Sequence, residues 1–202
     1  DGTEIIYTVK EDDVANYTNA ITGDIASGFT ITNTNTEKVD VSAKKEWVGP
    51  KAGPVTVHLL ADGTDTGKTL TLDEAGNWTG TFSSLDKYKA DGTAIVYTVK
   101  EDDITNYTST TTGDATTGFT ITNTNTEKVN ISGTKTWDDN NNQDGKRPAS
   151  ITVNLLKNGT KVDSKTVTPD ASGDWKYSFD GLDKYNADGT EITYTVSEDA
   201  VD

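Results

Sequence analysis

Three polar residues fall on strand faces that are otherwise apolar, and their types can react with one another. The segments VDVSAKKEW, IVYTVKE and FTITNTN each alternate in polarity, and the apolar face of each ends in Lys45, Glu101 and Asn123, respectively. This assignment follows because successive strand side chains point to opposite faces of a sheet. An amine, a carboxyl and a carboxamide that meet in a core either form a salt bridge with an amide partner or react with one another.

Each of these residues alone has a simple structural explanation. Strand ends often open to solvent, so a single polar residue at the end of an apolar face reads as a rim residue. Three together are harder to explain in that way, because an isolated buried ion is costly and buried polar groups are normally paired.

The elements that must position these residues are short strands. The segments are rich in Thr, Val and Tyr, they alternate with period two, and turn dipeptides such as Asp62-Gly63 and Asp91-Gly92 bound them. No stretch keeps a helical period over three turns. The sequence therefore predicts an all-β fold, a two-sheet β-sandwich of about seven strands in each repeat, and the regular alternation argues against disorder.

Internal repeats divide the 202 residues. DGTEIIYTVKEDD at the start of the chain returns 90 residues later and in a third, diverged copy, and GFTITNTNTEKV occurs twice, letter for letter. A repeat of this length has the size of a small sandwich domain. We expect the C-terminal half of a repeat, one complete repeat and the N-terminal portion of a repeat lacking its last strand, at residues 1–36, 37–126 and 127–202.

Charge and composition exclude several classes of partner. The chain has 33 acidic and 18 basic residues, a net charge of -15, and no basic cluster. A nucleic-acid binder or a protein that binds anionic membranes needs such a cluster, so neither partner is expected. Cysteine and methionine are absent, which is compatible with an extracellular protein, and no signal peptide, hydrophobic span or sorting tail is visible, so we expect an excerpt of a longer chain.

Several motifs together resemble a known family. The order of strands, the inward Lys of KxW on the first strand, the YTVxE strand, the closing FTITN strand and the DGKRPxxITVxLL stretch resemble the Cna B-type repeats of Gram-positive surface adhesins and pilins. The resemblance covers the whole chain. It implies a prealbumin-like, inverse-Ig-like β-sandwich in which a Lys and an Asn join in a spontaneous isopeptide bond promoted by a Glu, here Lys45, Asn123 and Glu101.

The implied chemistry suits these residue types. Burial disfavours both an ammonium and a carboxylate, so a proton can pass from one to the other and leave both neutral. A neutral amine is a nucleophile, and a protonated carboxyl can polarise the carboxamide and shuttle protons while ammonia leaves. The protein would act once on itself, so we expect no enzyme in the usual sense and no cofactor.

The two incomplete repeats carry incomplete sets of the same residues. Residues 1–36 hold Glu11 and Asn33 without a lysine, and residues 127–202 hold Lys135 and Glu198 without the asparagine. We expect the C-terminal part of one chain to be completed by the N-terminal segment of another copy, which would place Lys135 against Asn33 in trans. The sequence leaves open which Glu would serve, and truncation within two repeats is the alternative.

Other candidate sites are weaker. His58 is the only histidine and alternates with apolar residues, so it is expected to point outward, and neither a Ser-His-Asp set nor a metal set can be assembled. The loop around Asn140, Asn142 and Asp144 faintly resembles a calcium loop but lacks its leading Asp and closing Glu, so no metal is expected. Trp78 and Trp175 are in phase with apolar strand residues, which favours core packing over a sugar platform.

Two functions remain open from the sequence. The first is a stalk or spacer of a cell-wall-anchored surface protein, extracellular and packed against neighbouring repeats. The second is an adhesive module that presents loops such as 138–147 to a host matrix protein or glycan. Near-identity of the repeats favours the spacer, because a specific binding site seldom needs copying into every repeat.

Overall fold

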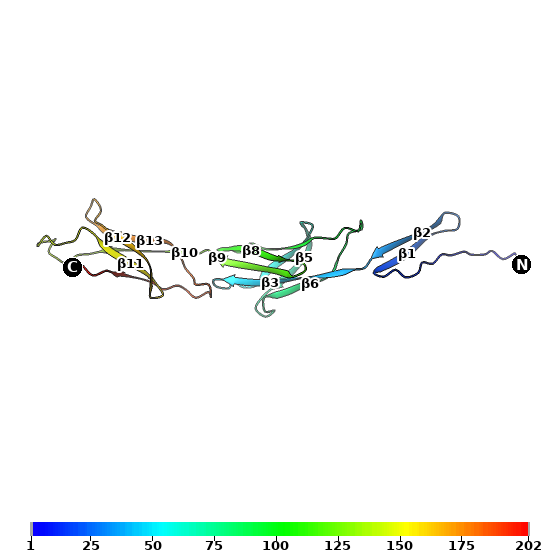
Figure 1. Cartoon of the computed structure of the whole chain (residues 1–202), viewed down its shortest axis with the longest axis horizontal. Coiled ribbons are helices and arrows are strands. Elements are labelled where there is room, and N and C mark those ends of the chain that lie inside the picture. The colour runs from blue at the N-terminus through cyan, green and yellow to red at the C-terminus, as the bar shows by residue number, and fades with distance from the viewer. Residues whose placement is uncertain (1, 202) are drawn as a thin grey trace. The chain divides into compact units, whose positions relative to one another are not determined.

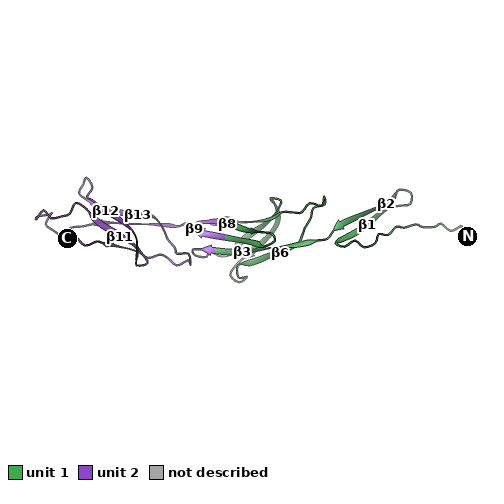
Figure 2. Ribbon diagram, viewed as in Figure 1, with its two compact units in different colours: residues 1–46, 53–102, 110–121 green, residues 47–52, 103–109, 122–202 purple. Residues whose placement is uncertain are grey.

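The structure is a computed structural model that describes residues 2–201, which form strands and loops without any helix (Figure 1). A helix able to span a membrane is accordingly not found in this described part. The residues divide into two compact units, coloured separately in Figure 2. The first comprises residues 1–46, 53–102 and 110–121, and the second comprises residues 47–52, 103–109 and 122–202.

The first unit contains two sheets that face each other and a separate hairpin. One sheet has the strand order β6-β3-β9-β8, the other has the order β5-β4-β7, and β1 pairs only with β2. Strands β3, β8 and β9 continue into the second unit. The bounds are β1 Tyr17–Asp24, β2 Gly28–Asn35, β3 Lys38–Val48, β4 Val55–Ala61, β5 Thr64–Leu72, β6 Thr79–Asp86, β7 Tyr97–Glu101, β8 Tyr107–Asp114 and β9 Gly118–Asn125.

The core of this unit is built by the alternating apolar faces of the two sheets. The completely buried side chains include Val41, Val57, Leu59, Leu72 and Ile121. Strand β3 reads exposed, buried, exposed, buried from Asp40 to Lys45 because its Val, Ala and Lys residues share one face. Apolar burial of this kind is the main driving force for folding.

The two copies of GFTITNTN form strands in very different surroundings. In β9, Phe119 is 7% exposed and Ile121 is fully buried, because β9 lies between β3 and β8 and faces the second sheet. In β2, Ile31 is 42% exposed and Phe29 is half-buried, because this strand has β1 as its sole partner among the described strands. The same sequence therefore leaves an apolar face uncovered in the first copy.

The second unit repeats the pattern without a closing hairpin. Strand β10 pairs with β13, and a second sheet has the order β12-β11-β14. A core cluster of Ile151, Val153, Leu155, Trp175 and Phe179 lies between these sheets, with Val167 beside it. The bounds are β10 Lys128–Lys135, β11 Ile151–Lys157, β12 Thr160–Val167, β13 Trp175–Asp183 and β14 Tyr194–Glu198.

The predicted fold class is confirmed, with two local differences. The sandwich formed by β3 to β9 has seven strands, as expected, but β8 lacks the alternating apolar residues by which strands were predicted. Trp175 packs in the core as predicted, at 4% exposure. The prediction for Trp78 is wrong, because this residue is half-buried in the turn before β6, where its backbone has a positive φ of 59°. It lies outside the strand, so the alternation of β6 does not apply to it.

Candidate functional site

A buried lysine and a buried glutamate lie together in the core of the first unit. Lys45 lies on β3 and Glu101 ends β7, which β4 holds in register through the pair Val57 and Glu101. Lys45 Nζ is 3.3 Å from Glu101 Oε1, and the two side chains are 0% and 2% exposed. The same nitrogen lies 3.4 Å from the carbonyl oxygen of Ile121 on β9. A charged pair this deep in a core costs desolvation free energy, which is recovered only with close geometry and further hydrogen bonds.

The surroundings of this pair shift Lys45 towards its neutral form. Burial lowers the pKa of the Lys45 ammonium below its ordinary value, and this effect exceeds the opposing attraction of the Glu101 carboxylate. Apart from the Lys45 contact, both carboxylate oxygens of Glu101 are buried without a hydrogen bond from any described residue. Transfer of the lysine proton to that carboxylate would remove both buried charges and leave a nucleophilic nitrogen.

Asn123 is buried and its amide is unpaired. The residue is 1% exposed and follows Ile121 by two positions, so the two side chains share one face of β9. Neither Oδ1 nor Nδ2 has a hydrogen-bond partner among residues 2–201. Buried polar groups are bonded in the great majority of cases, so an unsatisfied carboxamide in a core indicates strain, an unseen partner or a reactive role.

The second unit contains the corresponding lysine and glutamate in a more open setting. Lys135 Nζ is 3.0 Å from Glu198 Oε2, with side chains 24% and 29% exposed. Strand β14 pairs with β11 in the register Val153 to Glu198, which matches the register that places Glu101. The lysine nitrogen also lies 4.5 Å from the centre of the Trp137 ring. The pair is therefore assembled but not sealed from water.

The hairpin copy holds its own glutamate and asparagine together. Asn33 Nδ2 on β2 donates a hydrogen bond of 3.0 Å to Glu11 Oε1, and the contact is exposed to solvent. Residues 5–11, whose sequence corresponds to β7, form no strand here. Asn33 thus lies beside Glu11, without the enclosure that buries Asn123.

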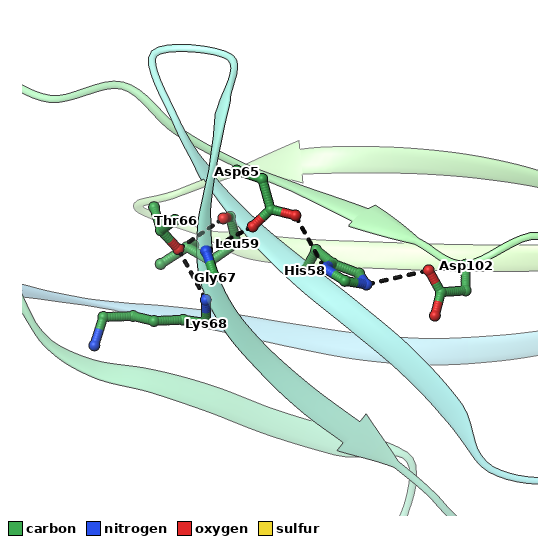
Figure 3. A network of polar contacts seen from close by, with 7 residues as sticks. All are labelled: His58, Leu59, Asp65, Thr66, Gly67, Lys68 and Asp102. Carbon is green, nitrogen blue, oxygen red and sulfur yellow. Dashed lines mark hydrogen bonds and ion pairs between the residues drawn. The ribbon is translucent and has the colours of Figure 1, made fainter.

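His58 makes a pair of contacts that the sequence did not suggest. Its ring nitrogens lie 3.1 Å from Asp65 Oδ2 and 3.1 Å from Asp102 Oδ1, so the imidazole lies between two carboxylates (Figure 3). The side chain is 28% exposed, on the side of β4 away from the core. With a carboxylate on each side and no hydroxyl nucleophile on either nitrogen, this network has no catalytic arrangement, and it serves to hold the β4–β5 hairpin to the end of β7.

The loop after Trp137 is organised by an ion pair. Asp139 accepts hydrogen bonds from Arg147 Nε at 2.9 Å and from the Asn142 backbone at 3.0 Å, and the guanidinium lies 5.4 Å from the Trp137 ring centre. Asn140, Asn141 and Asn142 all have positive φ angles. In residues 2–201 no three His, Cys, Asp or Glu side chains gather as a metal site would require.

Comparison with known proteins places this arrangement in a family. The model of the Cna protein B-type domain matches residues 1–34, 41–124 and 131–202. A curated collagen adhesin of Staphylococcus aureus is 42% identical over 100% of this chain, which spans 17% of that adhesin's length.

A solved structure of two repeats agrees. The crystal structure of two B repeat units of the Staphylococcus aureus collagen-binding protein is 41% identical and superposes with a TM-score of 0.56, covering 99% of this chain and 54% of the other. The structure of a single B repeat unit of that collagen-binding surface protein is 35% identical, with a TM-score of 0.40 over 80% of this chain and 86% of the other. The predicted family is thereby confirmed: the chain belongs to the Cna B-type domain family, whose members are repeats of surface adhesins and not enzymes.

Proposed function

We propose that this chain is a spacer region of a cell-wall-anchored surface protein, stiffened by a self-formed isopeptide bond between Lys45 and Asn123. The observation that carries the proposal is a buried Lys45–Glu101 pair together with a buried, unbonded Asn123 amide. Both features are costly in a core that serves packing alone. A reaction that consumes the charge and the amide would remove both costs.

The reaction would proceed in three steps. The Lys45 ammonium passes a proton to the Glu101 carboxylate, which leaves a neutral amine. The amine attacks Cγ of Asn123 while the protonated Glu101 donates a hydrogen bond to the developing oxyanion. The Cγ–Nδ2 bond then breaks, Nδ2 leaves as ammonia with protons shuttled by Glu101, and a Lys-Asn amide remains.

Folding supplies the proximity that an unreactive carboxamide needs. The bond would close a loop of roughly 80 residues, from the first strand of the complete repeat to its last. By the chain-entropy relation used for disulfides, such a loop contributes about 4.5 kcal/mol to stability. Tying β3 to β9 also keeps tension from unravelling the strands between them, which is the property a stalk requires, and it needs no cysteine.

Intact-mass spectrometry tests this proposal. The folded chain should be lighter by one ammonia for the bond at Lys45, and Lys45→Ala or Asn123→Ala should restore the full mass. Asn33→Ala is the matched control in the other GFTITNTN copy, and it should leave the Lys45 bond intact. Full unmodified mass in folded wild-type protein would refute self-crosslinking.

Adhesion to a host ligand is the second candidate function. The relative is named a collagen adhesin, so we infer that collagen or another matrix ligand is bound by other regions of the full protein. Within this chain, the 138–147 loop is occupied by the internal Asp139–Arg147 pair. Binding of collagen or a glycan panel by this chain, lost on Arg147→Ala, would favour the adhesive function instead.

The open strand edges suggest a further bond between copies of the chain. Among the described strands, β10 has β13 as its only partner and β2 has β1 alone, whereas their counterparts β3 and β9 are neighbours in one sheet. Unpaired edges of this kind readily accept another strand. We infer that β2 of one copy adds to β10 of another, which would bring Asn33 to Lys135 of the neighbour.

The geometry favours Glu198 as the promoter of that bond. Glu198 already contacts Lys135 at 3.0 Å, and its strand β14 already occupies the position beside β11. Residues 5–11 carry the competing Glu11 but form no strand, so the hairpin can dock without them. A denaturing gel should show a covalent ladder that Lys135→Ala and Asn33→Ala abolish and Lys45→Ala preserves. Monomer without a ladder would refute the trans bond.

A further inference from the structure

The NTEK sequence that follows both GFTITNTN copies forms the same rigid link twice. In the link of residues 125–128, the Glu127 backbone N–H donates a 3.0 Å hydrogen bond to Asn125 Oδ1. The Lys184 N–H donates to the Glu127 carbonyl at 3.1 Å, and Lys184 Nζ lies 3.3 Å from Glu127 Oε1. In the link of residues 35–38, these contacts recur with lengths of 2.9, 3.1 and 3.0 Å in Asn35, Glu37 and Lys87.

Beside the second link, a turn from the end of β3 is seated against the next repeat. The Gly49 N–H donates a 3.0 Å hydrogen bond to the Ala187 carbonyl, and the Tyr107 hydroxyl donates to the Pro50 carbonyl. Gly189 approaches so closely that a Cβ there would lie 2.9 Å from Pro50 Cα and 3.1 Å from Gly49 O. We name residues 48–50 the Val-Gly-Pro turn.

The seat of this turn requires glycine in the turn itself. Gly49 has a φ of 108°, and a Cβ at this position would come within 2.7 Å of Asn125 Cβ. Asn125 is fixed by its bond to the Glu127 backbone, so it cannot move away without breaking the link. A cavity of about 230 Å³ lies between the turn and the second link.

The first link has the same seat without an occupant. A groove of about 710 Å³ lies there, lined in part by Tyr17, Asn35, Ala90 and Gly92, which are the sequence counterparts of Tyr107, Asn125, Ala187 and Gly189. Gly92 has a φ of 83°, close to the 87° of Gly189, but no atom lies within 4 Å of its would-be Cβ. Tyr17 is 45% exposed.

We propose that the groove at the first link is the docking site for a Val-Gly-Pro turn of another repeat that precedes this one, and that the contact of residues 48–50 with residues 187–189 is the same interface already filled. Shape determines the occupant. Asn35 lines this groove as Asn125 lines the filled one, so the residue that docks against Asn35 must be a glycine, as Gly49 is. The longer loop after Trp137 has Asp139 at the position of Gly49, so a copy that pairs through β10 would leave this groove unfilled. The groove therefore distinguishes the two kinds of repeat, because a Val-Gly-Pro turn fills it and the longer loop does not.

The first test uses the chain as it is, with two matched glycines. Ala is equally strained at φ 87° and φ 83°, so Gly189→Ala and Gly92→Ala differ only in the presence of the turn. Amide hydrogen exchange of Gly49, followed by NMR, should speed up by roughly fivefold or more in Gly189→Ala, as loss of one hydrogen bond implies. It should be unchanged in Gly92→Ala. Equal behaviour of the two variants would overturn the proposal.

The second test fills the empty groove. A copy of residues 37–90 placed ahead of residue 1 completes the first repeat, because residues 1–36 repeat the sequence pattern of residues 91–126. In this longer chain the added copy of Gly49 should show a protected amide, and Gly92→Ala should now speed its exchange as Gly189→Ala does for Gly49. Gly49→Asp in the added copy should abolish the protection. The proposal would be overturned if Gly92→Ala did not change the amide exchange of the added Gly49. It would also be overturned if the added residues left amide exchange at Phe29 and Ile31 unchanged.

Discussion

Replacing Asn123 with leucine shows whether the crosslink forms, because the free energy of unfolding should fall if the bond is present and rise if it is not. Leucine has the same branching at Cγ as asparagine and removes the electrophilic carboxamide. If no bond forms, Asn123 is a buried amide with neither Oδ1 nor Nδ2 bonded among the described residues, at 1% exposure. Each such unsatisfied group costs about 1–3 kcal/mol, so Asn123→Leu would stabilise an uncrosslinked repeat.

In the crosslinked protein the same change has the opposite effect. It removes a bond that closes a loop of about 80 residues, which we estimate at about 4.5 kcal/mol. For a repeat of this size, 1 kcal/mol shifts Tm by roughly 4–8 °C, so the expected fall is about 20–35 °C. The Lys45–Glu101 pair is left in place, so the change does not strand a lone buried charge.

Differential scanning calorimetry of the full chain, with intact-mass spectrometry on the same samples, measures this effect. Asn33→Leu is the matched control, because Asn33 has the same sequence context on an exposed strand, and its effect on the unfolding of the middle repeat should stay within about 0.5 kcal/mol. The transition of the middle repeat can be assigned through amide exchange at Val41. An Asn123→Leu protein as stable as the wild type, or more stable, would refute the reasoning.

Three further predictions follow from the same geometry. Glu101→Gln keeps a hydrogen-bonding side chain but loses the proton acceptor, so the folded variant should keep its full mass by mass spectrometry, and loss of ammonia at the wild-type rate would contradict the promoter role. In Asn123→Leu the Lys45 amine stays titratable, and burial lowers its pKa. Just below pH 10.5 the unfolded chain therefore binds more protons than the folded one, so the free energy of unfolding should rise with pH there relative to the bonded wild type. Urea titrations in which the variant and the wild type show the same pH dependence would contradict this. Phe119→Ala should cost about 3–5 kcal/mol and Phe29→Ala less than about 1 kcal/mol in urea denaturation, and equal losses would contradict the difference in burial between the two identical strands.

The alternation of apolar and polar residues along the strands allowed most of the predictions made from the sequence. Lys45 and Glu101 are buried because each shares the face of apolar neighbours two residues away, and this parity is fixed by strand geometry whatever the fold. Their proximity is a matter of topology: β3 and β7 belong to different sheets, and only the packing of the two sheets brings Nζ within 3.3 Å of Oε1. The family resemblance supplied that step, since the residues alone do not.

The features that the sequence missed have no apolar period. Strand β8 reads YTSTTTGD and is exposed along almost all its length, so neither face marks it as a strand. Trp78 kept the phase of β6 but lies in a left-handed turn that ends the alternation before it. The links at residues 35–38 and 125–128 depend on contacts with Lys87 and Lys184, far along the chain. The sequence feature that could have indicated them is the NTEK segment, which is identical in both copies although it extends beyond the end of the strand.

Peptide mapping of the folded chain tests the central claim most directly. After digestion with trypsin and mass spectrometry, our account predicts one branched species that joins the peptide containing Lys45 to the peptide containing Asn123, with the summed mass less one ammonia. Cleavage after Lys45 should also be blocked, because its amine is acylated. Recovery of the two peptides as separate species of full mass, with Lys45 cleaved normally, would contradict the account.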